Sequence, residues 1–287
     1  MAARSSVDTI LRDLRDNWER FGESDPLWAA LTDPHSKGGR WDTNAFLATG
    51  EAEINVVMQR LASKGIIVSK AGRALDFGCG VGRLTQALAA RFREVHGVDI
   101  ADSMIEAAKR LNPRSGRCVF HCDDSPDLAR FEPRSFALVY SSLVLQHIAS
   151  PAAERYVYSL LRLLEPGGVA VLQVPDRFDE GPIATRVGVT ARQWARWVRS
   201  HVALRTRLAS ARSERTIGVD IGHAPRMEMH AIPEVEMRAI AHSVGVRLAD
   251  VALTNSTEPD FNGRLHYLDR APRRGWVSKQ YVLVNLR

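Results

Sequence analysis

The sequence predicts an α/β fold in which a mostly parallel sheet is covered by helices on both faces. Two observations lead to this prediction. First, an apolar strand at 73–77 runs into a helix at 84–90 through a glycine-rich loop. Second, strands and amphipathic helices alternate from there to residue 174 with short connections, which is typical of β-α-β units with parallel strands.

Each expected element has its own local signal. Ser103 followed by Glu106 forms a capping box that opens the helix after the second strand. Ser150 and Pro151 supply an N-cap and a first-turn proline for a later helix, which ends at the Glu-Pro-Gly-Gly turn at 165–168. The strands expected in this part of the chain are 73–77, 94–99, 118–122, 136–142 and 169–174.

The alternation breaks after residue 174 and resumes with a helix that starts at Pro233. A strand near 246–253 and a final strand at 280–286 follow. We therefore divide the chain into four segments. They are an N-terminal helical cap segment (1–72), the ligand-binding core (73–175), a helical insertion (176–230) and the C-terminal part of the core sheet (231–287).

Composition indicates an ordinary globular protein, with 45% hydrophobic and 25% charged residues. No apolar run approaches the roughly 18 residues of a membrane span, and the N-terminal sequence lacks the pattern of a secretory signal. Three cysteines give no disulfide framework. We therefore expect a soluble, cytoplasmic protein whose thiols are reduced and structural.

The formal charge of +6 is unevenly distributed. Residues 177–230 hold ten arginines and five acids, and residues 263–280 hold five bases and one acid. The remainder of the chain is net negative. This pattern indicates an anionic partner, or a solvated face, at two particular segments.

The glycine-rich run Leu75 to Arg83 carries the most information about function. Gly78, Gly80 and Gly82 remove side chains from the loop, so that a ligand can lie against backbone N–H groups where the next helix begins. A dinucleotide fingerprint requires G-x-G-x-x-G, but here the third glycine comes one residue early. The G-K-[ST] ending of a phosphate-binding P-loop is absent. A small anionic cofactor of another kind is therefore expected.

The run resembles motif I, acidic-x-G-x-G-x-G, of the class I S-adenosylmethionine (SAM) dependent methyltransferases of the small-molecule type. The resemblance implies SAM as the cofactor and a Rossmann-like, seven-stranded sheet whose last strand is antiparallel. It places Asp99 on the ribose hydroxyls and an acidic residue of Asp123-Asp124-Ser125 on the adenine, with Asp124 favoured over Asp123. The cofactor-binding residues that it implies in the core are Asp76, Gly78, Cys79, Gly80, Gly82, Arg83, Asp99, Ile100, Asp123, Asp124, Ser125 and Ser142.

Other interpretations of these residues remain open. Asp99 could be a solvent-exposed cap of the following helix. His121 to Asp124 resembles a run of metal ligands, but consecutive strand residues point to opposite faces, so no metal is expected. Upstream, Trp41 and Phe46 are candidates for contacting the cofactor through the cap segment, and anchoring in the core is the alternative.

His147, just after the fourth strand, is the first candidate for a general base, because an alcohol acceptor must lose a proton during methyl transfer. A packing role against the cofactor loop is equally open. His230 is a second candidate, since Met-x-Met-His-x-x-Pro resembles a family stretch that reaches the active site. Ala137 replaces an aspartate common in the family, and the [DNS]-P-P-[YFW] tetrapeptide of base-amine methylating enzymes is missing.

The insertion is expected to select the acceptor if the resemblance holds. Thr190 and Gln193 form a capping box for a helix that carries Trp194 and Trp197 on one stripe and arginines on another. This helix could be a lid over a substrate, a surface helix, or an interfacial helix on anionic lipid. His223 and His230 could share a helical face, but Pro225 between them argues against it.

The sequence therefore predicts a SAM-dependent methyltransferase that acts on a small or medium hydroxylated metabolite, by O-methylation with a histidine base. The acceptor expected is an anionic or polyhydroxylated small molecule. No DNA partner is expected, and a membrane-surface partner is not favoured. An RNA methyltransferase and a non-catalytic, anion-binding or membrane-binding protein of the same fold are the alternatives.

Overall fold

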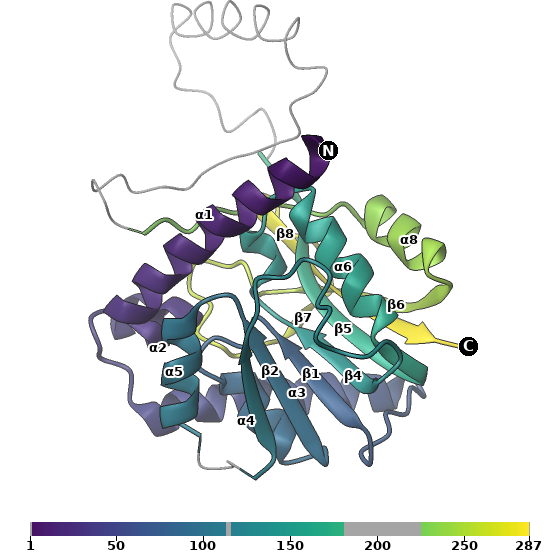
Figure 1. Cartoon of the computed structure of the whole chain (residues 1–287), viewed down its shortest axis with the longest axis horizontal. Helices are drawn as coiled ribbons and strands as arrows, with labels where there is room; N and C mark the ends of the chain where they lie inside the picture. The colour runs from purple at the N-terminus through teal and green to yellow at the C-terminus, as the bar shows by residue number, and fades with distance from the viewer. Residues whose placement is uncertain (1, 113–115, 181–224, 287) are drawn as a thin grey trace, which may run out of the picture.

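The computed structural model describes residues 2–112, 116–180 and 225–286. Within this part of the chain, one sheet of eight strands runs in the spatial order β3-β2-β1-β4-β5-β8-β6-β7 (Figure 1). The strands are β1 (Arg73–Phe77), β2 (Glu94–Asp99), β3 (Cys118–Cys122), β4 (Phe136–Ser141), β5 (Leu164–Asp179), β6 (Val246–Thr254), β7 (Tyr267–Leu268) and β8 (Gly275–Asn285). The five neighbouring strands β3, β2, β1, β4 and β5 pair in parallel, whereas β8 lies antiparallel between β5 and β6.

The predicted α/β class and the antiparallel last strand are confirmed. The sheet has one strand more than predicted, because the short β7 adds to the edge beside β6. The N-terminal segment is helical as expected, with α1 (Ala2–Ser24), α2 (Pro26–Ala30), the 3₁₀ turn η1 (Pro34–Ser36) and α3 (Thr43–Ser63). The remaining helices are α4 (Arg83–Ala89), α5 (Asp102–Arg110), η2 (Leu145–His147), α6 (Ala152–Arg162) and α8 (Glu234–Ser243).

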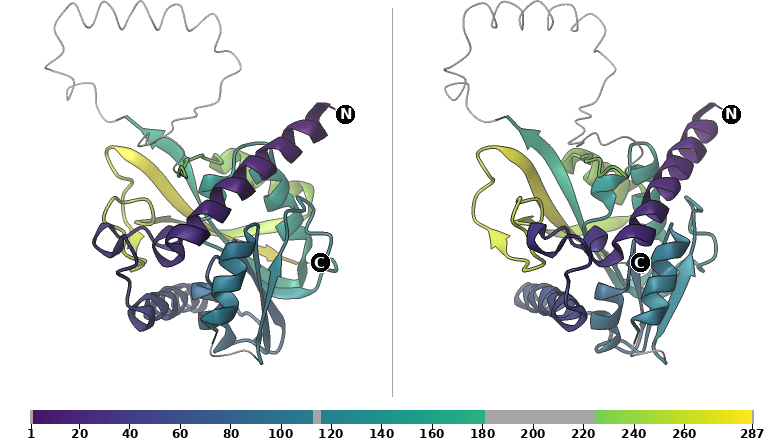
Figure 2. Two further views of the ribbon diagram at one scale, coloured as in Figure 1. Left: turned by 60° about the vertical axis from the view of Figure 1, so that its left-hand side comes forward. Right: turned by 90° about the vertical axis from the view of Figure 1, so that its left-hand side faces the viewer.

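The sheet separates two hydrophobic cores, because successive side chains of a strand point to opposite faces. Leu75 and Val139 pack with α6 and α8 on one face. Ala74 and Leu138 pack with α3 and α4 on the other face. Figure 2 shows helices on either side of the sheet and α1 lying across one end of it.

Helix α5 is capped differently from the prediction. Its first-turn N–H groups, from Asp102 and Ser103, donate to the carboxylate of Glu19 on α1 at 2.6 and 2.9 Å. The Ser103 hydroxyl donates to the Glu19 carbonyl at 3.0 Å, and Glu106 pairs with Lys109 instead. The predicted Ser103–Glu106 capping box is therefore wrong, because a carboxylate distant in sequence supplies the cap.

Strand β5 is longer at both ends than predicted. The turn expected at 165–168 is a bulge within the strand, since Phe136 pairs with Leu164 and Leu138 with Val169. At the other end β5 pairs with β8 as far as Asp179, so residues 176–179 are strand and do not begin a helical insertion. Residues 181–224, with the predicted helix around Thr190 and Gln193 and with His223, lie outside the described residues.

A buried ion pair joins the cap segment to the core. Arg83 Nη2 at the start of α4 lies 2.7 Å from Glu53 Oε2 on α3. The Tyr140 hydroxyl of β4 donates to the other oxygen of Glu53 at 2.8 Å. Glu53 is fully buried, so its charge depends on these two partners.

Replacing Glu53 with alanine should lower the free energy of unfolding by about 3–5 kcal/mol, because the Arg83 guanidinium would be left buried without its partner. Urea unfolding measures the change. The exposed Gln59→Ala change on the same helix is the matched control and should alter stability by less than about 0.5 kcal/mol. Equal effects of the two changes would contradict the role given to the ion pair.

Candidate functional site

A cavity of about 840 Å³, counted with its open mouth, lies where the parallel strands end and beneath α1. Parallel strands bring their carboxyl ends to one edge of the sheet, which is where ligands bind in open α/β folds. The residues that line the cavity come from α1, α2, α4, α5 and α6, and from the ends of β1 to β4 with the loops that follow them. They are Leu14, Trp18, Ala29, Ala30, Phe77, Gly78, Cys79, Gly80, Arg83, Leu84, Val98, Asp99, Ile100, Met104, Asp123, Ser142, Leu143, Val144, Ile148 and Tyr156.

The glycine loop after β1 forms the floor of this cavity. Gly78 has a φ of +71°, and a Cβ atom there would lie 2.3 Å from Val144 Cγ1. Its N–H donates to the Val98 carbonyl at 2.8 Å. Only glycine permits this packing, which brings the loops after β1 and β4 into contact.

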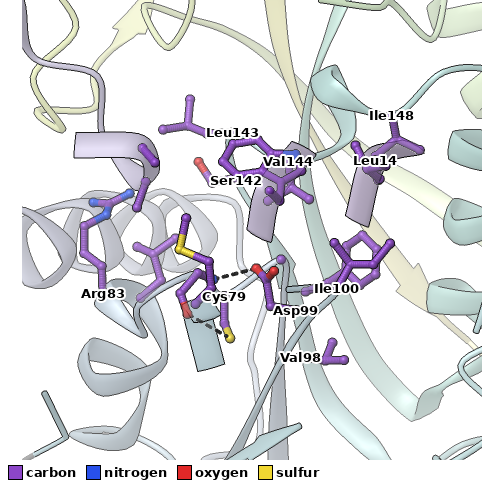
Figure 3. A pocket seen from close by; sticks show the side chains of 18 of the residues that line it. Leu14, Cys79, Arg83, Val98, Asp99, Ile100, Ser142, Leu143, Val144 and Ile148 are labelled. Carbon is purple, nitrogen blue, oxygen red and sulfur yellow. Dashed lines mark hydrogen bonds between the residues drawn. The ribbon is translucent and has the colours of Figure 1, made fainter. Parts of the chain in front are cut away.

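Asp99 at the end of β2 faces the cavity. Its carboxylate accepts the N–H groups of Gly80 at 2.8 Å and Ala101 at 3.0 Å, as Figure 3 shows for the first contact. Burial raises the pKa of Asp99, and the two backbone N–H groups oppose that shift. The glycine loop thus holds the Asp99 carboxylate in place through the Gly80 N–H, and Asp99 is not a solvent-exposed helix cap.

Asp76 lies beneath the loop and is not among the residues that line the cavity. It is 1% exposed and accepts a hydrogen bond from Thr85 Oγ1 at 2.6 Å. Burial raises the pKa of Asp76 to about 7. In this structure the side chain therefore ties the end of β1 to helix α4.

Gly82 and Arg83 open α4. Gly82 takes a φ of +82° as the N-cap, and a Cβ there would meet the Phe120 ring at 2.9 Å. Arg83 lines the cavity, but its guanidinium is committed to Glu53 on the side away from Asp99 (Figure 3). The contacts of Arg83 in this structure indicate that it helps to position the glycine loop.

The acidic pair after β3 divides between two places. Asp123 lines the cavity and accepts the Ser125 N–H at 2.8 Å. Asp124 lies 3.1 Å from Arg15 Nη1 of α1, in a shallow cleft that Ser125 also lines. Of the two carboxylates, Asp123 is the one that faces the cavity, whereas the sequence favours Asp124. The difference comes from the α1 arginine, whose position no local pattern reveals.

Trp41 and Phe46 pack against each other, with ring centroids 5.5 Å apart, and Phe46 is fully buried. Both belong to a hydrophobic cluster between the cap segment and α5, and neither lines the cavity. In this structure the two side chains therefore anchor the core, which is the alternative interpretation given for them above. Trp18 and Leu14 of α1 line the cavity instead, and their i, i+4 spacing on an amphipathic helix was the available signal.

A second cleft shares Leu14 and Trp18 with the cavity and contains both candidate bases. Its titratable lining consists of Asp13, Asp16, Arg20, His147, Arg226, Glu228 and His230. His147 Nδ1 lies 2.7 Å from the Glu228 carbonyl oxygen, and its ring meets the Trp18 ring edge-on at 5.5 Å. His230 Nε2 lies 3.6 Å from Glu228 Oε2. The two histidines thus meet on one side of α1.

The structure yields two further observations about partners. Within the described ranges, no group of three or more histidine, cysteine, aspartate or glutamate side chains is arranged to hold a metal ion. No helix in the same part of the chain is both long and apolar enough to cross a membrane. Cys79, Cys118 and Cys122 are free thiols.

The fold and the site define a class of protein: a Rossmann-like α/β protein with a glycine loop and an acidic residue after the second strand. Residues 74–168 match the family described as "Methyltransferase domain". Over these residues the predicted resemblance to SAM-dependent methyltransferases is confirmed.

Curated relatives match parts of the chain. A ubiquinone biosynthesis O-methyltransferase from Methylococcus capsulatus is 32% identical over 161 residues, which cover 55% of this chain and 61% of the relative. A trans-aconitate 2-methyltransferase from Variovorax paradoxus is 32% identical over 144 residues, which cover 48% of this chain and 52% of the relative. The chain thus spans about half the length of these curated relatives.

Solved structures share the fold over more of the chain. A magnesium protoporphyrin IX methyltransferase from Synechocystis, with bound S-adenosylhomocysteine, superposes with a TM-score of 0.56 at 17% identity. That superposition covers 96% of this chain and 99% of the other. A SAM-dependent methyltransferase from Methanosarcina mazei superposes with a TM-score of 0.52 at 15% identity, covering 78% of this chain and 97% of the other.

The buried Asp76 predicts a pH dependence of stability. Between its unfolded pKa, about 3.9, and its folded pKa, about 7, the unfolded chain releases a proton that the folded chain keeps. The contribution of Asp76 to the free energy of unfolding therefore falls as pH rises through this window. Asp76→Asn cannot ionise, so its stability relative to the parent should increase from about pH 4 to 7.

Urea unfolding of both proteins at the two ends of that window measures this difference. The exposed Asp260→Asn change serves as the control and should show no such gain. A stability difference for Asp76→Asn that stays constant with pH would show that the folded carboxyl group is already ionised at low pH.

Proposed function

We propose that this protein is a methyltransferase that binds SAM in the cavity above the glycine loop and transfers its methyl group to a hydroxyl of a small or medium acceptor. The single observation that carries the proposal is the Asp99 carboxylate. It faces the cavity from the end of β2 and is held there by the glycine-loop N–H of Gly80.

The cavity residues fit this cofactor in three respects. A carboxylate can accept two hydrogen bonds from a ribose diol, and Asp99 is the half-buried carboxylate that lines the cavity at the expected strand end. Ile100 and Met104 add apolar surface for a heterocycle, while Asp123 supplies an acceptor nearby. The loop after β1 has no side chain at Gly80, where a Cβ atom would have only Ala30 Cβ nearby, at 3.6 Å, and this lets a ligand approach the backbone.

When bound, SAM supplies an electrophilic methyl group on a sulfonium. The chain's own residues position the donor, and the cavity keeps water from it, because methyl transfer is an in-line displacement whose rate depends on alignment. Leu14 and Trp18 line both the cavity and the second cleft, so the two spaces adjoin along α1 and an acceptor in the cleft would lie next to the donor.

The second cleft supports a hydroxyl as the nucleophile. An alcohol or phenol loses its proton as the new bond forms, and a histidine of this cleft would receive it. The match to a relative named as an O-methyltransferase supports oxygen as the methylated atom. A small, polar acceptor fits the mixture of acids, arginines and histidines on the cleft walls.

Isothermal titration of SAM into the protein should show binding, and Asp99→Ala should weaken it by about 100-fold or more, since two charge-assisted hydrogen bonds would be lost. The exposed Asp260→Ala change is the matched control and should leave the affinity unchanged. Incubation with radiolabelled SAM and fractionated small molecules should then transfer label to a low-molecular-weight fraction. A protein that shows no heat of binding with SAM would rule the proposal out.

A further inference from the structure

The geometry points to a division of labour between the two histidines of the second cleft. We infer that His230, oriented by the Glu228 carboxylate, is the catalytic base, and that His147 is a positioning residue that joins the cofactor side to the acceptor side. This inference rests on the proposed function for the chemistry but on hydrogen bonds of the ligand-free chain for the assignment.

The assignment starts from a buried relay of side chains. The Leu143 N–H donates to Gln173 Oε1 at 2.7 Å. Because a backbone N–H is only a donor, this contact fixes which end of the Gln173 amide is oxygen. Gln173 Nε2 then donates to Gln146 Oε1 at 3.2 Å and to Ser278 Oγ at 2.8 Å.

The two ring nitrogens of His147 each have a hydrogen-bond partner in this relay. With its oxygen facing Gln173, Gln146 presents its NH₂ group to His147 Nε2 at 3.2 Å. At the other end the Glu228 carbonyl can only accept, so His147 Nδ1 must carry the proton in the 2.7 Å contact. Every donor in the relay thus points from Leu143 towards Glu228.

This relay leaves His147 no free basic nitrogen. Its Nδ1 is a donor, and the lone pair of Nε2 already accepts from an amide. Protonation of Nε2 would set a donor against the Gln146 NH₂ group. Burial lowers the pKa of His147 to about 4, which agrees with a neutral ring. The ring is therefore a spacer between η2 and the 228–230 segment.

The relay links the two sides of the active site. Leu143 lines the cavity and has a φ of +64°, an unfavourable conformation for leucine that needs support from its surroundings. Glu228, at the opposite end of the relay, lines the second cleft. The fully buried Gln173 is the hub, since it holds both the Leu143 loop and Gln146.

His230 has the arrangement expected of a base. The backbone N–H of His230 donates to the Gln146 carbonyl oxygen at 2.7 Å, which holds the main chain at His230 in place. Its Nε2 lies within ion-pair distance of the Glu228 carboxylate, which would stabilise the imidazolium formed on proton uptake. In the part of the chain that the structure describes, no hydrogen bond engages its Nδ1, so this atom is the one left to take a proton.

The proposed step is the transfer of a methyl group to the acceptor oxygen with loss of the hydroxyl proton. The acceptor oxygen forms a bond to the methyl carbon, the carbon–sulfur bond breaks with its electron pair going to sulfur, and the hydroxyl proton passes to His230 Nδ1. The other charged or titratable groups that face the cleft are Asp13, Asp16 and Arg20 from α1, Arg226 and Glu228 from the 225–230 segment, and His147 from η2.

The first test needs no acceptor. ¹⁵N NMR of the ligand-free full-length chain should show His147 as the neutral Nδ1–H tautomer across about pH 5 to 8. Diethyl pyrocarbonate, which acylates accessible neutral imidazoles, should modify His230 and the exposed His35 but leave His147 unmodified by peptide mapping. Titration of His147 within this pH range, or its acylation at the rate of His35, would overturn the assignment.

The second test uses variants and the acceptor fraction that takes up label. His230→Gln should lower the transfer rate by about 100-fold or more, the usual contribution of a general base, while SAM affinity stays unchanged. His147→Asn retains a donor where Nδ1 lies, so it should keep most of the rate, whereas His147→Leu should lose it and also slow acylation of His230.

Glu228→Gln should slow both transfer and acylation of His230, and the exposed Glu132→Gln change is its matched control. If His147→Asn abolishes transfer while His230→Gln does not, the roles are reversed and the inference fails. If SAM does not bind at all, the proposed function fails, but the tautomer and acylation results still decide the assignment of the histidines.

Discussion

The parallel register of β1 with its two neighbours is the constraint on which the site depends. Asp76 pairs with Gly97 on β2 and with Tyr140 on β4, so the three strands end in nearly the same row. The hydrogen bonds continue beyond the strands, from the Gly78 N–H to the Val98 carbonyl and from the Asp123 N–H to the Asp99 carbonyl. A shift of one residue in the pairing of β2 with β1 would turn Asp99 to the other face of the sheet.

Charge burial is the cost of this arrangement. Asp99 ends in a largely apolar cavity, and Asp76 and Glu53 lie within the protein, where an ionised group is stable only beside partners. The chain supplies those partners locally for Asp99, through the loop N–H groups, and across the fold for Glu53, through Arg83 and Tyr140. The same contacts that make the carboxylates tolerable also fix the loop that forms the floor of the cavity.

The sequence predicts what is encoded locally. Strands β2 and β3 have the bounds expected from their apolar runs, and Gly78, Gly80 and Asp99 line one cavity at the strand ends. What it misses depends on contacts distant in sequence. Glu19 replaces the expected capping box of α5, and Arg15 draws Asp124 away from the cavity. These outcomes follow from where α1 packs, which no local pattern specifies.

The tautomer of His147 belongs to the same category. From the sequence, the imidazole after β4 is a candidate base, because an alcohol acceptor must lose a proton, and a packing role is equally open. Its role changes only when Gln146 and Gln173 are seen to orient each other, with a backbone donor at Leu143 and a backbone acceptor at Glu228. These two end groups cannot reverse their hydrogen-bonding roles, so the direction of every bond between them is determined. The relay therefore connects the second cleft to the backbone of the cavity, and of the two histidines in that cleft it engages both ring nitrogens of His147 but not those of His230.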